Sequence, residues 1–123
     1  MTSQSVKNQV IMRFAALSQL TFEEAESYTH LCTAAADEFI VRLKGVPNDV
    51  QREKLLNLFA ASAYHRYCCL LMARQQYSSM SLSDVSVKND MKASCEAALK
   101  LKTLSLEDCA DILSAKSTVI YSV

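Results

Sequence analysis

Apolar residues recur at intervals of three and four positions along most of the chain. Near the N-terminus the row consists of Val6, Val10, Phe14 and Leu17. Such a spacing places side chains on one face of an α-helix, and four later segments repeat it. The pattern therefore predicts an all-α fold, a small bundle of about five helices in a single domain, 1–123. The predicted helices span residues 5–20, 22–44, 49–76, 88–102 and 105–116.

Polar and helix-breaking residues mark the predicted helix boundaries. Thr21 and Glu24 have the spacing of a capping box, in which each side chain accepts a hydrogen bond from the backbone amide of the other residue. Gly45 is placed to end the second helix, and Pro47 prevents that helix from continuing. Asn48 opens a second capping box. These signals predict that helices begin after residues 21 and 48, and that one ends near residue 44.

The third predicted helix is apolar on nearly every side between residues 55 and 72. A helix of this kind is buried all round, either in a protein core or in lipid. Arg66 argues against lipid, because an arginine at the centre of a membrane costs about 2.5–3.5 kcal/mol on insertion scales. We therefore expect no membrane contact. The helix is expected to be covered by the others, or by the others together with a neighbouring subunit.

Composition supports a helical domain and weakens the case for nucleic-acid binding. The chain has one glycine and one proline, whereas sheet-rich domains need many turn residues. Thirteen basic residues balance thirteen acidic ones, so the chain lacks the positive charge that drives binding to phosphate backbones. A single glycine also cannot build a glycine-rich phosphate loop. Phosphate-binding and nucleic-acid-reading functions are therefore not expected.

The cysteines form an odd set without a Cys-x-x-Cys pair, and each lies in an apolar helical pattern. They are Cys32, Cys68, Cys69, Cys95 and Cys109. Free cysteine in such a pattern behaves as a small hydrophobic residue. The first five residues are polar and do not resemble a signal peptide. We therefore expect reduced cysteines in the core of an intracellular protein.

His65 and Cys69 are the nearest approach to a chemical site, because they lie one helical turn apart and could share a metal ion. A zinc site would need two further ligands, and no second Cys or His pair has a usable spacing. A Cys–His nucleophile would need an activated thiol, whereas apolar surroundings raise the thiol pKa. We therefore expect no catalytic residue, no metal and no cofactor, and a protein that is not an enzyme.

Two segments depart from the helical period. Residues 78–87 alternate apolar side chains with serines, which predicts an extended loop or short strand before the fourth helix. Residues 118–123 form a β-prone, apolar tail. Both could bind a partner strand, or be a flexible loop and a frayed terminus. The predicted interface residues are Met80, Leu82, Asp84, Val85, Val87, Val119, Ile120, Tyr121 and Val123.

Three stretches of the chain carry a resemblance to a known family. A capped helix at 20–25 continues as the alanine-rich stretch 34–40, and an alanine- and tyrosine-rich segment follows at 58–67. Residues 81–87, Ser-Leu-Ser-Asp-Val-Ser-Val, are similar to a Ser-x-Gly-Asp-Val-x-Val-type loop, with Ser83 at the glycine-like position. In these features the chain resembles the small helical head–tail connector, or adaptor, proteins of tailed bacteriophages and prophages.

The resemblance implies a structural virion subunit in the phage neck, assembled in the host cytoplasm. Such subunits form a cyclic homo-oligomer, typically twelvefold, which docks beneath the portal protein and presents a surface to a further neck or tail protein. DNA passes through the lumen without being read. The alternative expectation from the sequence is a small helical partner-binding or regulatory module without catalytic activity.

Overall fold

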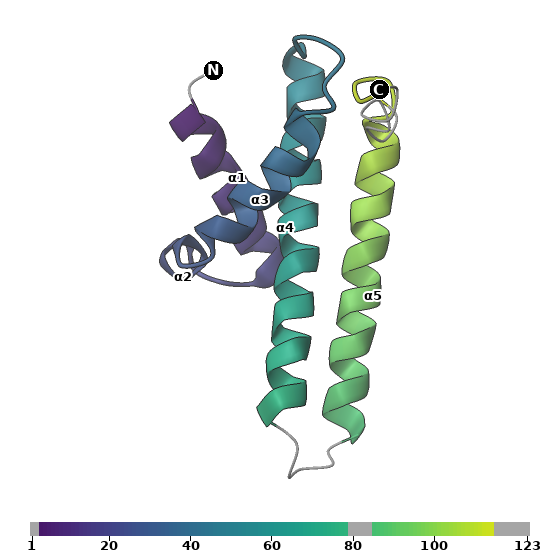
Figure 1. Cartoon of the computed structure of the whole chain (residues 1–123). Helices are drawn as coiled ribbons and strands as arrows, with labels where there is room; N and C mark the ends of the chain where they lie inside the picture. Colours follow the sequence, from purple (N-terminus) through teal and green to yellow (C-terminus); the bar gives the residue numbers. More distant parts are fainter. Residues whose placement is uncertain (1–2, 79–84, 115–123) are drawn as a thin grey trace, which may run out of the picture.

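The computed structural model describes residues 3–78 and 85–114, and this part of the chain is an all-α bundle (Figure 1). The predicted fold class is therefore confirmed, although several helix boundaries differ from the prediction. The helices of the described residues are α1 (Ser3–Ser18), α2 (Phe22–Glu26), α3 (Thr29–Ile40), α4 (Asp49–Ser78) and α5 (Val85–Asp108).

Helix α4 is the centre of the arrangement, with α5 beside it as a long antiparallel partner (Figure 1). Helices α1 and α3 pack on α4 as well, over its N-terminal half, and α2 joins them on the side away from α5. Helices α1 and α5 thus share one support without packing closely against each other. This arrangement positions the site described below.

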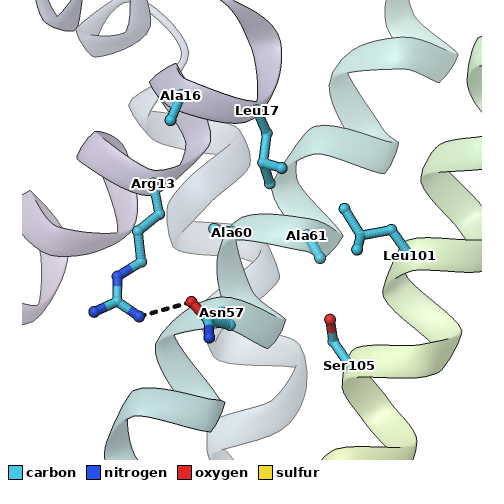
Figure 2. Close-up of a pocket in the computed structure, with 8 residues that line it drawn as sticks. All are labelled: Arg13, Ala16, Leu17, Asn57, Ala60, Ala61, Leu101 and Ser105. Carbon is cyan, nitrogen blue, oxygen red and sulfur yellow. Dashed lines mark hydrogen bonds between the residues drawn. The ribbon is translucent and has the colours of Figure 1, made fainter.

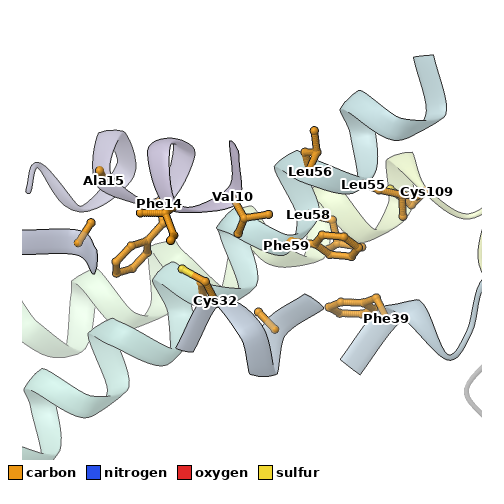
Figure 3. Close-up of a cluster of buried hydrophobic side chains, with 14 of the residues drawn as sticks. Val10, Phe14, Ala15, Cys32, Phe39, Leu55, Leu56, Leu58, Phe59 and Cys109 are labelled. Carbon is orange, nitrogen blue, oxygen red and sulfur yellow. The ribbon is translucent and has the colours of Figure 1, made fainter. Parts of the chain in front are cut away.

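The predicted central burial of the third helix holds for the first half of α4. The row of buried side chains runs from Leu55 to Ala63, broken only by the exposed Asn57. Phe14 of α1 and Phe39 of α3, among the largest fully buried side chains, join this core (Figure 3). From Tyr64 onward most described side chains of α4 are half-buried. The second half of α4 is therefore covered on fewer sides than predicted.

Helix α1 ends in a Schellman motif at Gln19, a boundary close to the predicted one. Gln19 has a φ of 60°, in the left-handed region, and the backbone N–H of Leu20 donates to the carbonyl of Ala15 over 3.0 Å. This bond satisfies a carbonyl that would otherwise lack a partner at the helix end. A glutamine at a position that favours glycine places local strain in the backbone.

The predicted helix 22–44 is wrong as a single helix, because the chain leaves helical geometry at Tyr28, where φ is −109° and ψ is 22°. The Thr21–Glu24 capping box that starts α2 is confirmed. The hydroxyls of Ser27 and Thr29 donate to the carbonyls of Glu24 and Glu26, each over 2.6 Å. Side-chain bonds of this kind offer the backbone an alternative to a continuous helix.

The end of α3 also differs from the prediction, since the helix stops at Ile40 rather than Lys44. The following residues pair with the chain after α5. Lys44 N–H donates to the Ile112 carbonyl over 3.0 Å, and Ser114 N–H donates to the Arg42 carbonyl over 2.7 Å. This antiparallel bridge draws the backbone away from the helix, so Gly45 does not act as the left-handed cap.

The predicted helix 88–102 and the start of the predicted helix 105–116 form one helix, α5, which ends at Asp108, so the predicted break between them is absent. One face of α5 packs inward, since Cys95 and Ala98 are buried and positions 101, 102, 105 and 106 are half-buried. No glycine or proline interrupts this stretch, so burial of that face favours an unbroken helix. Both ends of the predicted loop 78–87 are helical, because α4 reaches Ser78 and α5 already begins at Val85; residues 79–84 lie outside the described residues.

Candidate functional site

A cleft of about 400 Å³ lies between α1 and α5, with α4 as its floor (Figure 2). It arises because α1 and α5 both pack on α4 but stand apart from each other. We refer to this cleft as the α1–α5 groove. Its lining residues are Arg13, Ala16, Leu17, Asn57, Ala60, Ala61, Leu101 and Ser105.

The floor and walls of the groove are mainly apolar. Ala60 and Ala61 form the floor, and their short side chains leave the space that larger residues would fill. Leu17 of α1 and Leu101 of α5 reach in from opposite walls, as Figure 2 shows, and both are half-buried. A concave apolar surface with few polar groups is typical of binding sites.

The charged member of the lining, Arg13, is held by neighbours on α4. Its guanidinium donates to Asn57 Oδ1 over 2.8 Å and to the Glu53 carbonyl over 3.2 Å, and it forms a salt bridge with the Glu53 carboxylate. Figure 2 shows the bond to Asn57, and the Glu53 carboxylate pairs the charge of the arginine. The groove therefore presents little net charge to an incoming surface.

A second cleft, of about 200 Å³, lies between the same three helices further along α4. Its lining residues are Ser18, Tyr64, Tyr67, Cys68, Leu71, Met91 and Ser94. The α4 residues of the two clefts lie at positions 57, 60, 61, 64, 67, 68 and 71. Steps of three and four residues keep these positions on one face of the helix. The two clefts thus follow a single face of α4 that runs between α1 and α5.

The titratable groups of the second cleft stay neutral at physiological pH. Burial raises the pKa of Tyr64 and Tyr67 and also that of the Cys68 thiol. A protonated phenol or thiol is a poor nucleophile and a poor base. These side chains suit contact with an apolar surface better than proton transfer.

The cysteines lie mainly in the interior, as expected. Cys32, Cys68, Cys95 and Cys109 are buried, and Cys69 is half-buried; all are free thiols. Burial raises the pKa of Cys32 to about 11. The Cys69 sulfur lies 3.5 Å from His65 Nε2, so these two side chains do meet as their spacing indicated. Within the described residues, His, Cys, Asp and Glu side chains form no group of three that could hold a metal ion.

The predicted interface falls mostly on segments that the structure does not describe. Val85 and Val87 lie in the first turn of α5 rather than in a loop. The other predicted interface residues, Met80, Leu82, Asp84, Val119, Ile120, Tyr121 and Val123, lie outside the described residues. The α1–α5 groove was not predicted. Its signal in the sequence is the pair Ala60–Ala61 inside a helix whose neighbouring positions carry larger apolar residues.

Comparisons of the chain with protein families, curated proteins and solved structures find no match. None of the helices among the described residues has both the length and the continuous apolar character that a membrane span needs. The geometry of the described residues therefore carries the functional argument.

Proposed function

We propose that this protein is a structural assembly subunit that binds further copies of itself through the α1–α5 groove. The observation that carries the proposal is the apolar face of α4 that runs between α1 and α5, over which the described part of the chain places no other helix. Small residues form its floor and Leu17 and Leu101 its walls. A groove of this form takes an apolar helix or an apolar projection from another protein.

The exposed surface of the chain itself offers an apolar projection. Val41 and Val46, in the connection between α3 and α4, are exposed by 78% and 96%, and Val50, in the first turn of α4, is exposed by 67%. None of these valines lines the groove of its own subunit. The chain carries no net charge, so copies do not repel one another strongly. We therefore assign a second copy as the occupant of the groove.

When one surface of a subunit contacts a different surface of the neighbouring copy, the interface is called heterologous. Repeated around an axis, such an interface closes into a ring when the rotation between neighbours divides a full turn. A ring is also what the resemblance to phage head–tail connectors implies. We therefore propose the more specific role of a neck subunit whose ring, about twelvefold, docks beneath a portal and passes DNA through its lumen.

The second candidate is a small partner-binding module, in which the groove holds a helix of an unrelated protein. The same apolar lining favours this candidate, but the exposed valines and the neutral charge favour self-association. The two candidates differ in stoichiometry. A partner-binding module stays monomeric or dimeric at all concentrations, whereas a ring subunit forms large assemblies.

The connector role is tested by mixing the purified protein with a portal ring from the same phage or prophage. We expect the protein to co-migrate with the portal in size-exclusion chromatography, in a fixed ratio near one subunit per portal subunit. The Leu101→Glu variant should not co-migrate with the portal in this ratio, because it places a charge in the groove that joins neighbouring subunits. A protein that ignores the portal would remove the connector role and leave the partner-binding module.

A further inference from the structure

Helices α4 and α5 bring three thiols and one imidazole together outside the α1–α3 core. Cys95 of α5 is buried against Cys68 and Cys69 of α4. The Cys69 sulfur also lies 3.5 Å from His65 Nε2. Of these residues, only Cys68, which lines the second cleft, takes part in the proposed assembly role.

The register of the two helices places Cys69 and Cys95 opposite each other. Ser62 of α4 and Lys102 of α5 both reach the carboxylate of Glu38, each over 3.5 Å, so these two positions lie at one level of the pair. Cys69 follows Ser62 by seven residues, and Cys95 precedes Lys102 by seven. Because the helices are antiparallel, two turns along each lead to the same level again.

The side chains at the contact between these helices are small. Cysteine and alanine side chains, Cys95 and Ala98, form the α5 side of this layer. Small side chains allow helices to approach at the short end of the usual 8–10 Å range. Burial raises the pKa of the Cys95 thiol, and the neighbouring Cys69 raises it further.

We propose that Cys69 and Cys95 are an oxidation site at which a peroxide forms a disulfide between α4 and α5. His65 accepts the proton of the Cys69 thiol, and the resulting thiolate attacks hydrogen peroxide. This step gives a sulfenic acid at Cys69 and releases hydroxide, which takes the proton from His65 and leaves as water. The Cys95 thiol then displaces a second water and forms the S–S bond. Overall the two thiols lose two protons and two electrons, and the peroxide becomes two waters.

The environment fits these roles. Cys69 is the half-buried member of the set and is open to a small oxidant, whereas Cys95 is buried. Burial lowers the pKa of His65, Lys102 and Arg66 lower it further and Glu38 raises it, so the imidazole is a neutral proton acceptor, although a weaker base than free histidine. Burial raises the pKa of Cys95 to about 11, so this thiol reacts second and not first.

The disulfide would fix α5 against α4 in the part of the pair that α1–α3 do not cover. Met91 and Ser94, which precede Cys95 on α5, line the second cleft. The bond would therefore limit movement of the α5 wall of that cleft. The inference does not depend on the proposed assembly role, because the two thiols belong to one subunit.

The test treats the reduced full-length protein with hydrogen peroxide, alkylates the remaining thiols and measures the intact mass. We expect three alkylated cysteines after oxidation and five before it, since the chain has five cysteines. We also expect the midpoint of thermal unfolding to rise by roughly 10 °C, because the bond closes a loop of about 25 residues. A protein that keeps five alkylated thiols would overturn the proposal.

Variants identify the pair, and circular dichroism confirms that each variant is folded. Cys69→Ala and Cys95→Ala should each show the same number of alkylated thiols before and after peroxide treatment. Cys68→Ala and the buried control Cys109→Ala should leave the loss unchanged. If the cross-link formed in Cys69→Ala but not in Cys68→Ala, the partner of Cys95 would be Cys68, and the inference would be overturned. A mass of two chains on a non-reducing gel would overturn it as well.

Discussion

Glu38 of α3 and Arg66 of α4, 28 positions apart in the sequence, form a salt bridge with 2.9 Å between Oε1 and Nη2. The other carboxylate oxygen lies 3.5 Å from Lys102 Nζ on α5, so one side chain joins three helices. Lys102 Nζ and Arg42 Cζ also lie over the Phe39 ring, each 5.7 Å from its centroid. Charge and aromatic contacts thus meet where α3 crosses the α4–α5 pair.

The Glu38 carboxylate should make stability depend on acid pH. Burial alone raises its pKa, but the hydrogen bond and charge of Arg66 and the charge of Lys102 outweigh burial and hold the pKa below the ordinary value of 4.5. A lowered folded-state pKa gives stability that is present above pH 4.5 and is lost as the pH falls through the lowered value.

Glu38→Gln is therefore expected to reduce the free energy of unfolding at pH 7 by about 0.5–1 kcal/mol. The figure is small because about a third of the side chain is in contact with water, which screens the charges. Urea unfolding at pH 7 and at pH 3 measures the effect. The difference between wild type and variant should shrink at pH 3, and an equal difference at both pH values would contradict the role given to the carboxylate.

Phe14→Ala is expected to destabilise the core by about 3–5 kcal/mol, since Phe14 is completely buried. Its ring packs edge-on against Tyr67 with centroids 5.5 Å apart, and against Tyr28 at 6.3 Å. Met12→Ala on the same helix is the control, because Met12 is 60% exposed and should change stability by less than about 0.5 kcal/mol. Similar effects for the two variants in chemical unfolding would mean that α1 is packed differently.

Gln19→Gly is expected to stabilise the protein, by up to about 1 kcal/mol. The backbone of Gln19 has a φ of 60°, where a side chain costs roughly 1–2 kcal/mol and glycine costs nothing. The greater freedom of glycine in the unfolded chain offsets part of this gain. Thermal unfolding measures the change. A lower unfolding midpoint for Gln19→Gly would show that the end of α1 does not hold this conformation.

The sequence predicts where helices begin better than where they end. The capping boxes at Thr21 and Asn48 are both present, because each depends on residues three positions apart. The end of α3 depends on Ser114, which bonds to Arg42 from 72 positions away. A local sequence pattern does not reveal so distant a partner. Gly45 was therefore predicted to cap the helix, and this cap does not form.

The candidate site was beyond sequence reasoning for the same reason. The spacing of apolar residues on α4 indicates burial, but it does not say which neighbour covers each side. The groove exists because α1 and α5 settle on α4 with a gap between them above Ala60 and Ala61. Apolar residues in segments that break the helical period of the sequence were easier to single out, and they led to an interface prediction that lies mostly outside the described residues.

The central claim, self-association through the α1–α5 groove, is tested most directly by light scattering across a range of concentrations. The wild-type mass should rise from that of a 13.7 kDa monomer towards that of a ring. Leu101→Glu should stay monomeric, because it buries an unpaired charge in the groove. Leu99→Glu, on an exposed part of the same helix that does not line the groove, should assemble as the wild type does. A wild type that remains monomeric, or a Leu101→Glu variant that reaches the wild-type mass, would contradict the claim.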